Sequence, residues 1–295
     1  VAPPERCPAA SAAGLRAAAG ETVDWFVRNQ RADGTWLYLY DADTDTAPRE
    51  YNAVRHAGVT MGLYQAASAG LPGARGAADR GVAWAQDRLI ERGDWAALSY
   101  QGQTSAGAAA LLVAGLAERR TQTGDARYDD LLGQLGRFLV AQTEPSGAVL
   151  ATYDVGSGAP TAGVYSAYYT GEAYWALARL HRLFPTGGWG DVADRIGAYL
   201  ATRRDDVEDH WPAIPDHWAA YGLAETVAFD ERARGEPQPR RTARADLVEE
   251  PRRERSTALH GQDRDHGQRP GRDTLAHAAH PRSRAGSAST RLPRD

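Results

Sequence analysis

The chain repeats its own sequence at long range, and this repeat limits the possible folds more than any other feature. WFVRNQRADGTWLYLYD, residues 25–41, aligns with RFLVAQTEPSGAVLATYD, residues 137–154. Farther along, HAGVTMGLY aligns with YTGEAYWAL, which pairs Gly58 with Gly171. A repeat of about 113 residues corresponds to two supersecondary units, so one unit of roughly 50 to 60 residues holds two helices. The sequence therefore predicts an array of αα-hairpins.

Apolar residues recur at helical spacing between residues 14 and 230. The odd-numbered helices have charged faces, whereas the even-numbered ones are small and apolar on almost every side. A helix that is apolar all round is buried, so the alternation indicates amphipathic outer helices around apolar inner ones. The expected helices span residues 14–30, 54–69, 74–92, 104–120, 126–143, 167–184, 189–203 and 217–230.

Two arrangements satisfy this alternation: a closed ring of hairpins, the α/α toroid, and an open solenoid. We expect an all-α fold, an α/α toroid in the form of an incomplete ring of about four αα-hairpins over residues 14–230. Strand signals are confined to short extended segments such as TWLYLYD and AVLATYD. Residues 1–13 are expected to be a flexible N-terminus.

The composition changes abruptly at residue 231. Residues 231–295 contain no Trp, Tyr, Phe or Ile, and Arg, Pro, His, Asp and Gly dominate. Such a segment cannot bury enough apolar surface to offset the entropy of ordering it. We expect either a disordered C-terminal tail or an out-of-frame translation of a GC-rich gene, in which hydrophobic periodicity is lost. Acidic residues are mixed among the arginines, so a nucleic-acid-binding arm is not expected.

Charge and composition exclude several classes of protein. The formal net charge of −4 gives no reason to expect a nucleic-acid partner, and no apolar run is long enough for a membrane-spanning segment. The single cysteine, Cys7, excludes a disulfide framework and a cysteine-based zinc site. No cofactor is expected, because the sequence has no phosphate loop or dinucleotide fingerprint.

No metal is expected either, because the acidic loop from Asp41 to Asp45 lacks the glycine and terminal glutamate of a calcium-binding loop. The oligomeric state is left open. The compartment also stays open between cytoplasm and cell envelope. No signal peptide is recognisable, and the sequence begins with Val, which leaves room for a missing upstream segment.

The hairpin array, the turn QRADGTW and the segments YNAVRHAG, YYTGEAYWALARL and PDHWAAYGL together resemble the α/α-toroid proteins. These include six-hairpin glycosidases, sugar 2-epimerases and uronate lyases, and also terpenoid cyclases and prenyltransferases. The last three segments are most similar to a bacterial toroid family whose chemistry is uncharacterised. The chain departs from the cyclase branch, since DADTDTAP is its nearest match to the acidic Asp-x-Asp-Asp motif. The resemblance covers residues 14–230, which supply four hairpins where the six-hairpin fold has six.

Polar and aromatic residues gather at the start of every expected inner helix and then stop. In a toroid the inner helices run in one direction, so their N-termini meet at one end, where helix dipoles favour anionic or oxyanionic groups. We therefore expect a single cleft at that end. Its candidate residues are Tyr51, Asn52, Arg55, His56, Gln101, Tyr168, Tyr169, Glu172, Asp216, His217 and Trp218.

Three of these residues are the candidates for catalysis. Glu172 lies in an otherwise apolar helix, where an unpaired carboxylate is costly to bury, so it has either a partner such as Arg55 or a catalytic role. His56 is a candidate general base or else a hydrogen-bonded core histidine. Asp216 is a candidate second carboxylate or else a helix N-cap. The remaining candidates are expected to bind substrate, although His217 and Trp218 also suit packing at the rim.

Aromatic rings beside carboxylates, Arg and His indicate a sugar ligand, because apolar sugar faces stack on Trp and Tyr while polar side chains bind the hydroxyls. A glycoside hydrolase acting on an oligo- or polysaccharide would use Glu172 as the acid, with Asp216 or Asp154 opposite. Further candidates for stacking are Trp36, Tyr38 and Tyr40.

Other activities suit the same cleft. A sugar epimerase or uronate lyase would use His56 or His217 as the general base, with Arg55 binding a carboxylate. A non-catalytic glycan-binding or scaffold protein would need the cleft alone. A terpenoid cyclase is the most distant alternative, because it requires an apolar aromatic cavity and an aspartate-rich acid.

Overall fold

The computed structural model describes residues 10–208 and 216–233, which belong to the first of two units, Val1–Ala245 and Asp246–Asp295. Residues 1–9 of the expected flexible N-terminus and residues 234–295 of the expected tail lie outside the described residues. Residues 231–233 do not begin a tail, because they continue the last helix.

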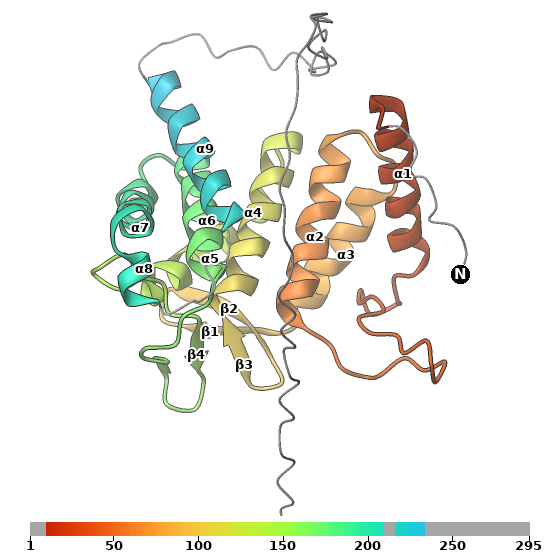
Figure 1. Ribbon diagram of the computed structural model, residues 1–295, viewed down its shortest axis with the longest axis horizontal. Helices are drawn as coiled ribbons and strands as arrows, with labels where there is room; N and C mark the ends of the chain where they lie inside the picture. The colour runs from red at the N-terminus through yellow and green to blue at the C-terminus, as the bar shows by residue number, and fades with distance from the viewer. Residues whose placement is uncertain (1–9, 209–215, 234–295) are drawn as a thin grey trace, which may run out of the picture. The chain divides into compact units, whose positions relative to one another are not determined.

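Helices in the described part of the chain form two layers (Figure 1). The outer helices are α1 (Ala12–Arg28), α3 (Ala74–Gln86), α5 (Asp129–Gln142) and α7 (Trp189–Thr202). The inner helices are α2 (Ala53–Ser68), α4 (Ala106–Thr123), α6 (Tyr169–Leu183) and α9 (His217–Ala233). Each inner helix packs against the next one in chain order, and a short helix, α8 (Arg204–Val207), precedes α9. The expected α/α toroid, an incomplete ring of four hairpins, is confirmed.

Burial follows the alternation of apolar and amphipathic helices. Residues 106–117 of α4 and 170–180 of α6 are buried without interruption, whereas α5 and α7 bury one face. Inner helices can be apolar all round because they pack against neighbouring inner helices and also against outer helices. None of the described helices is long and apolar enough to cross a bilayer.

Side-chain caps mark the start of the inner helices α2 and α4. The Oδ1 atom of Asn52 accepts a hydrogen bond from the Arg55 amide at 2.9 Å and starts α2. The Oγ atom of Ser105 accepts one from the Ala108 amide at 3.3 Å and starts α4. Such caps satisfy amides that have no partner within the helix, so these residues define the first turns of α2 and α4.

A small antiparallel sheet departs from the all-α expectation. The helix expected over residues 74–92 ends at Gln86, and a hairpin follows, because Gly93 adopts a φ of 59° and turns the chain. The sheet order is β1-β2-β3-β4-β5, and β3 runs directly into α4, so the sheet lies where the inner helices begin (Figure 1). The strands are β1 (Leu89–Arg92), β2 (Trp95–Tyr100), β3 (Gln103–Ser105), β4 (Thr152–Asp154) and β5 (Ala159–Pro160).

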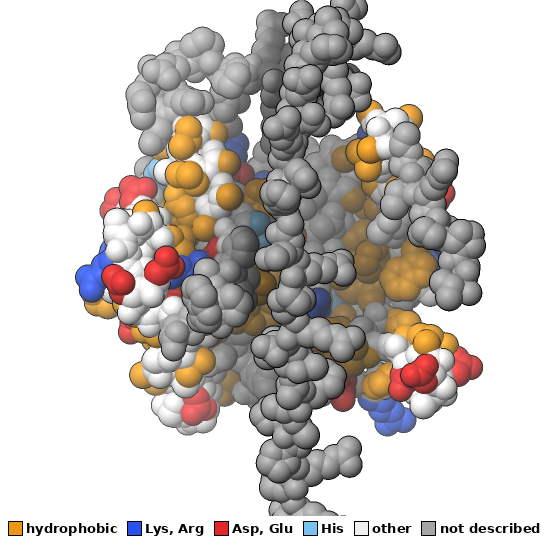
Figure 2. Space-filling model, viewed as in Figure 1, with side chains coloured by type: hydrophobic (Ala, Val, Ile, Leu, Met, Phe, Trp, Pro, Cys, Tyr) orange, Lys and Arg blue, Asp and Glu red, His pale blue; other side chains and the backbone are white. Residues whose placement is uncertain are grey.

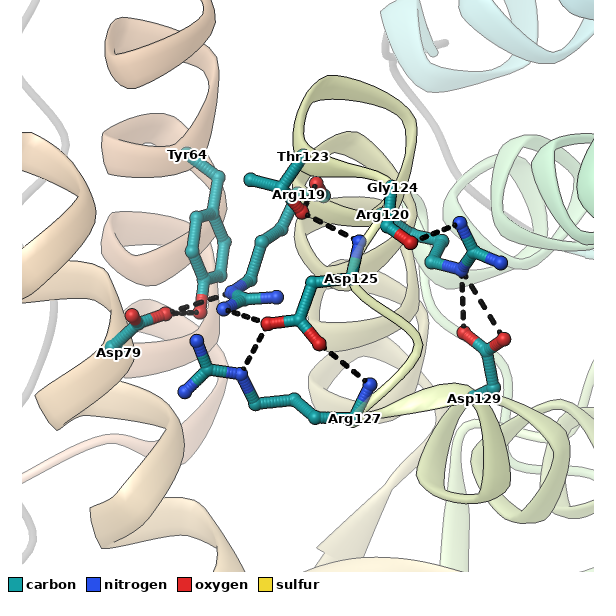
Figure 3. Close-up of polar contacts among 9 residues, drawn as sticks. All are labelled: Tyr64, Asp79, Arg119, Arg120, Thr123, Gly124, Asp125, Arg127 and Asp129. Carbon is teal, nitrogen blue, oxygen red and sulfur yellow. Dashed lines mark hydrogen bonds and ion pairs between the residues drawn. The ribbon is translucent and has the colours of Figure 1, made fainter.

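The opposite end of the ring contains a buried ion-pair cluster (Figure 3). The Arg119 side chain of α4 is 2% exposed and pairs with Asp79 and Asp125, each at 3.0 Å. The buried Tyr64 hydroxyl donates to Asp79 at 2.7 Å, and Arg127 binds Asp125 at 2.6 Å. The cluster joins α2, α3 and α4 to the segment between α4 and α5. Burying the Arg119 charge is tolerated because two carboxylates compensate it.

Candidate functional site

A cavity of about 910 Å³ lies between α1, α2 and the N-terminal ends of α6 and α9. One end, called here the polar mouth, is lined by Asn52, Arg55, Tyr168, Tyr169, Glu172, His217 and Trp218. The rest, called here the apolar groove, is lined by Ala19, Thr22, Val23, Phe26, Val54, Gly58, Val59, Gly62, Leu63, Ala66, Ala69, Leu71 and Leu111. The polar mouth thus consists of residues from the first turns of inner helices.

The sequence-based candidates divide into two groups. Seven of the eleven residues expected at the cleft line the polar mouth. The other four, Tyr51, His56, Gln101 and Asp216, do not line the cavity. The structure therefore brings together residues from three separate helix starts, α2, α6 and α9, as the direction of the inner helices requires.

Glu172 is the buried acid of the polar mouth. It lies in the first turn of α6, its side chain is 4% exposed, and its Oε2 atom has no hydrogen-bond partner among the described residues. Burial raises the pKa of Glu172 to about 8, and the nearby charge of Asp216 adds to the rise. The expected ion pair with Arg55 does not occur within the described part of the chain. Glu172 is therefore a protonated carboxylic acid at neutral pH.

Asp216 is the N-cap of α9. Its Oδ1 atom accepts hydrogen bonds from the amides of Trp218 at 3.1 Å and Ala219 at 3.2 Å. Its Oδ2 atom accepts one from Arg204 Nη1 at 2.7 Å. Of the two expectations for this residue, these contacts match the cap. Asp216 acts on Glu172 through its charge, although it does not face the cavity.

His56 lies in the wall behind the cavity and has no free nitrogen. Its Nε2 atom is 2.8 Å from the carbonyl oxygen of Gly81, which can only accept, so Nε2 carries the proton. Its Nδ1 atom then accepts from the Tyr51 hydroxyl at 2.7 Å. Burial lowers the pKa of His56 to about 4, and the ring packs between Trp36 and Trp84. We therefore assign His56 and Tyr51 to the core and not to the reacting groups.

Gln101 is a turn residue. Gln101 and Gly102 have φ values of 52° and 75° and join β2 to β3. Two successive positive φ values are typical of the two-residue hairpin turn that matches strand twist. The exposed Gln101 side chain lies outside the cavity lining.

The remaining sequence candidates also lie outside the cavity lining. Trp36 is buried, and its indole N–H donates to the Phe26 carbonyl oxygen at 3.1 Å. Tyr38 and Tyr40 belong to the loop before α2. Asp154, the other expected second carboxylate, accepts from the Gly156 amide in the β4–β5 turn.

The aromatic rings of the polar mouth form a continuous cluster. His217 lies 4.5 Å from the Trp218 ring and 6.2 Å from the Tyr168 ring, measured between centroids. Trp218 stacks on Trp175, with centroids 5.5 Å apart. Gly107 of α4 leaves space for both Tyr169 and Glu172: a Cβ there would lie 2.4 Å from the Tyr169 ring and 2.8 Å from Glu172 Oε2. Together these groups give an aromatic surface beside one acid.

Sequence reasoning missed the apolar groove and the role of Arg204. The groove is lined along α2 by Gly58, Gly62 and Ala66, and their spacing of four residues was a signal for a groove along one helix face. Arg204 lies in α8, a helix of one turn, where no pattern indicated its bond to Asp216. Among the described residues no group of three His, Cys, Asp or Glu side chains could hold a metal ion.

Comparison with known proteins shows the fold. No family model and no curated protein matches the sequence. The structure is similar to a cellobiose 2-epimerase from Spirochaeta thermophila, with a TM-score of 0.57, 15% identity and coverage of 77% of this chain and 66% of that one. It is also similar to a cellobiose 2-epimerase from Bacillus thermoamylovorans, with a TM-score of 0.58, 12% identity and coverage of 75% and 69%.

A family 76 glycoside hydrolase (mannosidase) from Bacteroides thetaiotaomicron is similar as well, with a TM-score of 0.54, 13% identity and coverage of 75% and 68%. The chain spans about two thirds of the length of these solved structures. The fold is therefore an α/α toroid. The resemblance inferred from the sequence is confirmed at the level of the fold, and the structural neighbours are carbohydrate-active proteins.

Proposed function

We propose that the polar mouth binds a carbohydrate and that Glu172 donates a proton to it. The observation that carries this proposal is a buried carboxyl group with a pKa of about 8 and an unpartnered oxygen, at the edge of a cavity with aromatic walls. A carboxyl group that stays protonated at neutral pH is suited to general-acid catalysis. Structural neighbours named as sugar epimerases and a mannosidase support a sugar as the ligand.

The preferred reaction is glycoside hydrolysis. Glu172 would protonate the leaving-group oxygen while the sugar stacks on Trp218 and Tyr168, and the exposed Arg55 would bind hydroxyl or carboxylate groups of the ligand. Asp216 would act as a positioning residue, because its charge helps to keep Glu172 protonated. Hydrolysis also needs a base or nucleophile across the sugar ring, and Glu172 is the one carboxylate among the described lining residues.

A sugar epimerase is the second candidate, because His217 lines the same mouth. Epimerisation requires a base that removes a proton from carbon next to a carbonyl group, and an imidazole nitrogen can act as such a base. Of the two expected bases, His56 and His217, His217 is the one preferred here, since both nitrogens of His56 are already bonded. Glu172 would then protonate the carbonyl oxygen.

The test is a comparison of the 295-residue chain with Glu172→Gln on oligosaccharides, uronides and reducing disaccharides. Hydrolysis is followed by release of reducing ends and epimerisation by chromatography of the products. Loss of at least about 100-fold in turnover with retained calorimetric binding is expected for Glu172→Gln, since general acids contribute about 10²–10⁴-fold. The exposed Asp154→Asn is the matched control and should keep full activity.

The outcomes separate the candidates. Loss of hydrolysis in Glu172→Gln with little effect of His217→Gln supports the hydrolase. Loss of product interconversion in His217→Gln supports the epimerase. Sugar binding without turnover in the unmodified chain would make this a binding protein. Full turnover by Glu172→Gln, or no sugar binding at all, would contradict the proposal.

A further inference from the structure

The outer helices follow one packing rule, and α1 departs from it. α3 packs chiefly against α2, α5 against α4, and α7 against α6, so each outer helix rests on the inner helix of the preceding hairpin. Contacts with the inner helix of the same hairpin are weaker. By this rule α1 should rest on an inner helix that precedes α2 around the ring. Among the described helices there is none.

The exposure of α1 agrees with a missing partner. α1 buries Val23 alone, whereas α3, α5 and α7 each bury at least five residues. Leu15 of α1 is 65% exposed and Trp25 is 42% exposed. The apolar groove runs along α1 and α2, and Val23 and Phe26 line it. A helix with so little burial is marginal by itself, because tertiary packing supplies most helical stability.

A glycine in α2 marks the same place. Three glycines of the inner helices sit at close approaches: a Cβ would lie 2.4 Å from Tyr169 at Gly107, 2.9 Å from Met61 at Gly115 and 2.3 Å from Asp216 at Gly171. Gly62 lies in the middle of α2 and lines the groove, yet a Cβ there would meet nothing within 4 Å. A mid-helix glycine is unfavourable by about 1 kcal/mol relative to alanine, so a close neighbour is expected at Gly62.

The other edge of the ring is also incomplete. α2, α4 and α6 are each covered by the next outer helix, but no described outer helix follows α9. Tyr221, Leu223 and Val227 of α9 are 51%, 58% and 46% exposed, and hydrophobic side chains gather over α9 on the surface (Figure 2). The uncovered surface of α9 and the uncovered surfaces of α1 and α2 therefore border one gap, which lies between the last and the first described helices of the ring.

We infer that this gap is filled by further αα-hairpins that follow α9 in the gene, and that the last inner helix of these hairpins packs in the apolar groove against Gly62. The face that this helix turns toward the groove must be apolar and must pack closely, like the faces of α4 and α6. Residues 234–295 as printed contain no Trp, Tyr, Phe or Ile, so their composition does not suit such a helix. The occupant is therefore encoded in another reading frame after α9. The chain's span of about two thirds of the solved toroids agrees with this.

Sequencing the genomic DNA across the codons for residues 220–245 and translating all three frames is the first test. We expect one alternative frame to continue with Trp- and Tyr-bearing helices at the spacing seen before residue 230. Confirmation of the printed frame, with no apolar periodicity in the other two, would overturn the inference. This result does not depend on any sugar assay, so a failure of this inference can be distinguished from a failure of the proposed function.

The second test compares the effect of Gly62→Leu on the Tm of two chains, in which the effect should have opposite signs. Gly62→Leu in the 295-residue chain should raise the Tm by about 2–4 °C, because it adds helix propensity in open space. In the chain continued in the restored frame it should lower the Tm, because the side chain would clash with the seated helix. The exposed Gly76→Ala of α3 is the control and should raise the Tm in both chains.

Two results would overturn the inference here. One is an equal rise in Tm for Gly62→Leu in both chains, which would mean that no helix packs against Gly62. The other is a dimer of the 295-residue chain in sedimentation velocity that persists in the continued chain and is abolished by Gly62→Leu. That result would make a second copy of the chain the occupant of the groove.

Discussion

The carboxylate of Asp216 lies directly against Gly171, where a Cβ would come within 2.3 Å of its Oδ2 atom. This contact brings the start of α9 onto the start of α6, one residue before Glu172. The absence of a side chain at Gly171 thus lets one carboxylate approach another, and the approach helps to raise the pKa of Glu172 to about 8. The two acids have different roles because, of the two, only Asp216 accepts hydrogen bonds from the described residues.

Gly171→Ala should therefore separate Asp216 from α6. We expect a loss of about 2 kcal/mol in unfolding free energy, from overpacking and from a weakened cap on α9. The pKa of Glu172 should fall as the Asp216 charge moves away. Urea denaturation measures the first effect and carboxyl NMR titration the second. Gly20→Ala in α1, where a Cβ meets nothing within 4 Å, should instead be neutral or stabilising. Equal behaviour of the two variants would contradict this account.

Glu172 should make stability fall as pH rises. The unfolded chain releases this proton near the ordinary pKa of 4.5, whereas the folded chain keeps it until pH is about 8. Between these values the folded state binds the extra proton, so unfolding free energy decreases with pH and then levels off. Glu172→Gln should remove this dependence, with a difference of up to about 5 kcal/mol at pH 8. Thermal denaturation from pH 4.5 to 9 is the measurement, and parallel curves would rule out the raised pKa.

His56 should make stability fall as pH drops, in a lower pH range than Glu172. Its pKa is lowered from 6.5 to about 4, so below pH 6.5 the unfolded chain takes up a proton that the folded chain does not. Stability should fall by up to about 3 kcal/mol as pH drops from 6.5 to 4 and stay level above 6.5. His56→Gln should flatten this acid limb while costing about 2 kcal/mol at pH 8 through the hydrogen bonds to Tyr51 and Gly81. An unchanged acid limb in urea melts would exclude this role.

Two arginines on one carboxylate should differ in their effect on stability. Arg119 and Arg127 both bind Asp125, but their side chains are 2% and 54% exposed. Arg119→Met should lower unfolding free energy by about 3–5 kcal/mol, because it removes the buried charge that pairs with Asp79 and leaves Asp125 with Arg127 alone. Arg127→Met should have a much smaller effect that depends on salt, because the exposed Arg127 pairs with Asp125 in water. Similar losses from both variants would show that the cluster in Figure 3 is not organised around Arg119.

Much of the fold follows from local patterns in the sequence. The alternation of amphipathic and apolar helices predicted two layers, and the internal repeat predicted hairpins, since both depend on burial along a single helix. The sheet was largely missed, because LIERGDWAALSY lies next to a strong helical pattern and its strands are stabilised by pairing across the hairpin. The end of α3 at Gln86 was misplaced for the same reason.

The direction of the inner helices also followed from the sequence, and it placed seven candidate residues around one cavity. The tertiary structure alone decided which residues at the start of each helix face that cavity. Arg55 and His56 are neighbours in sequence, but successive helical residues point about 100° apart. Arg55 consequently faces the cavity, while His56 packs between Trp36 and Trp84. Sequence pattern indicates that a helix forms, whereas the rotation of that helix depends on contacts with helices far away along the chain.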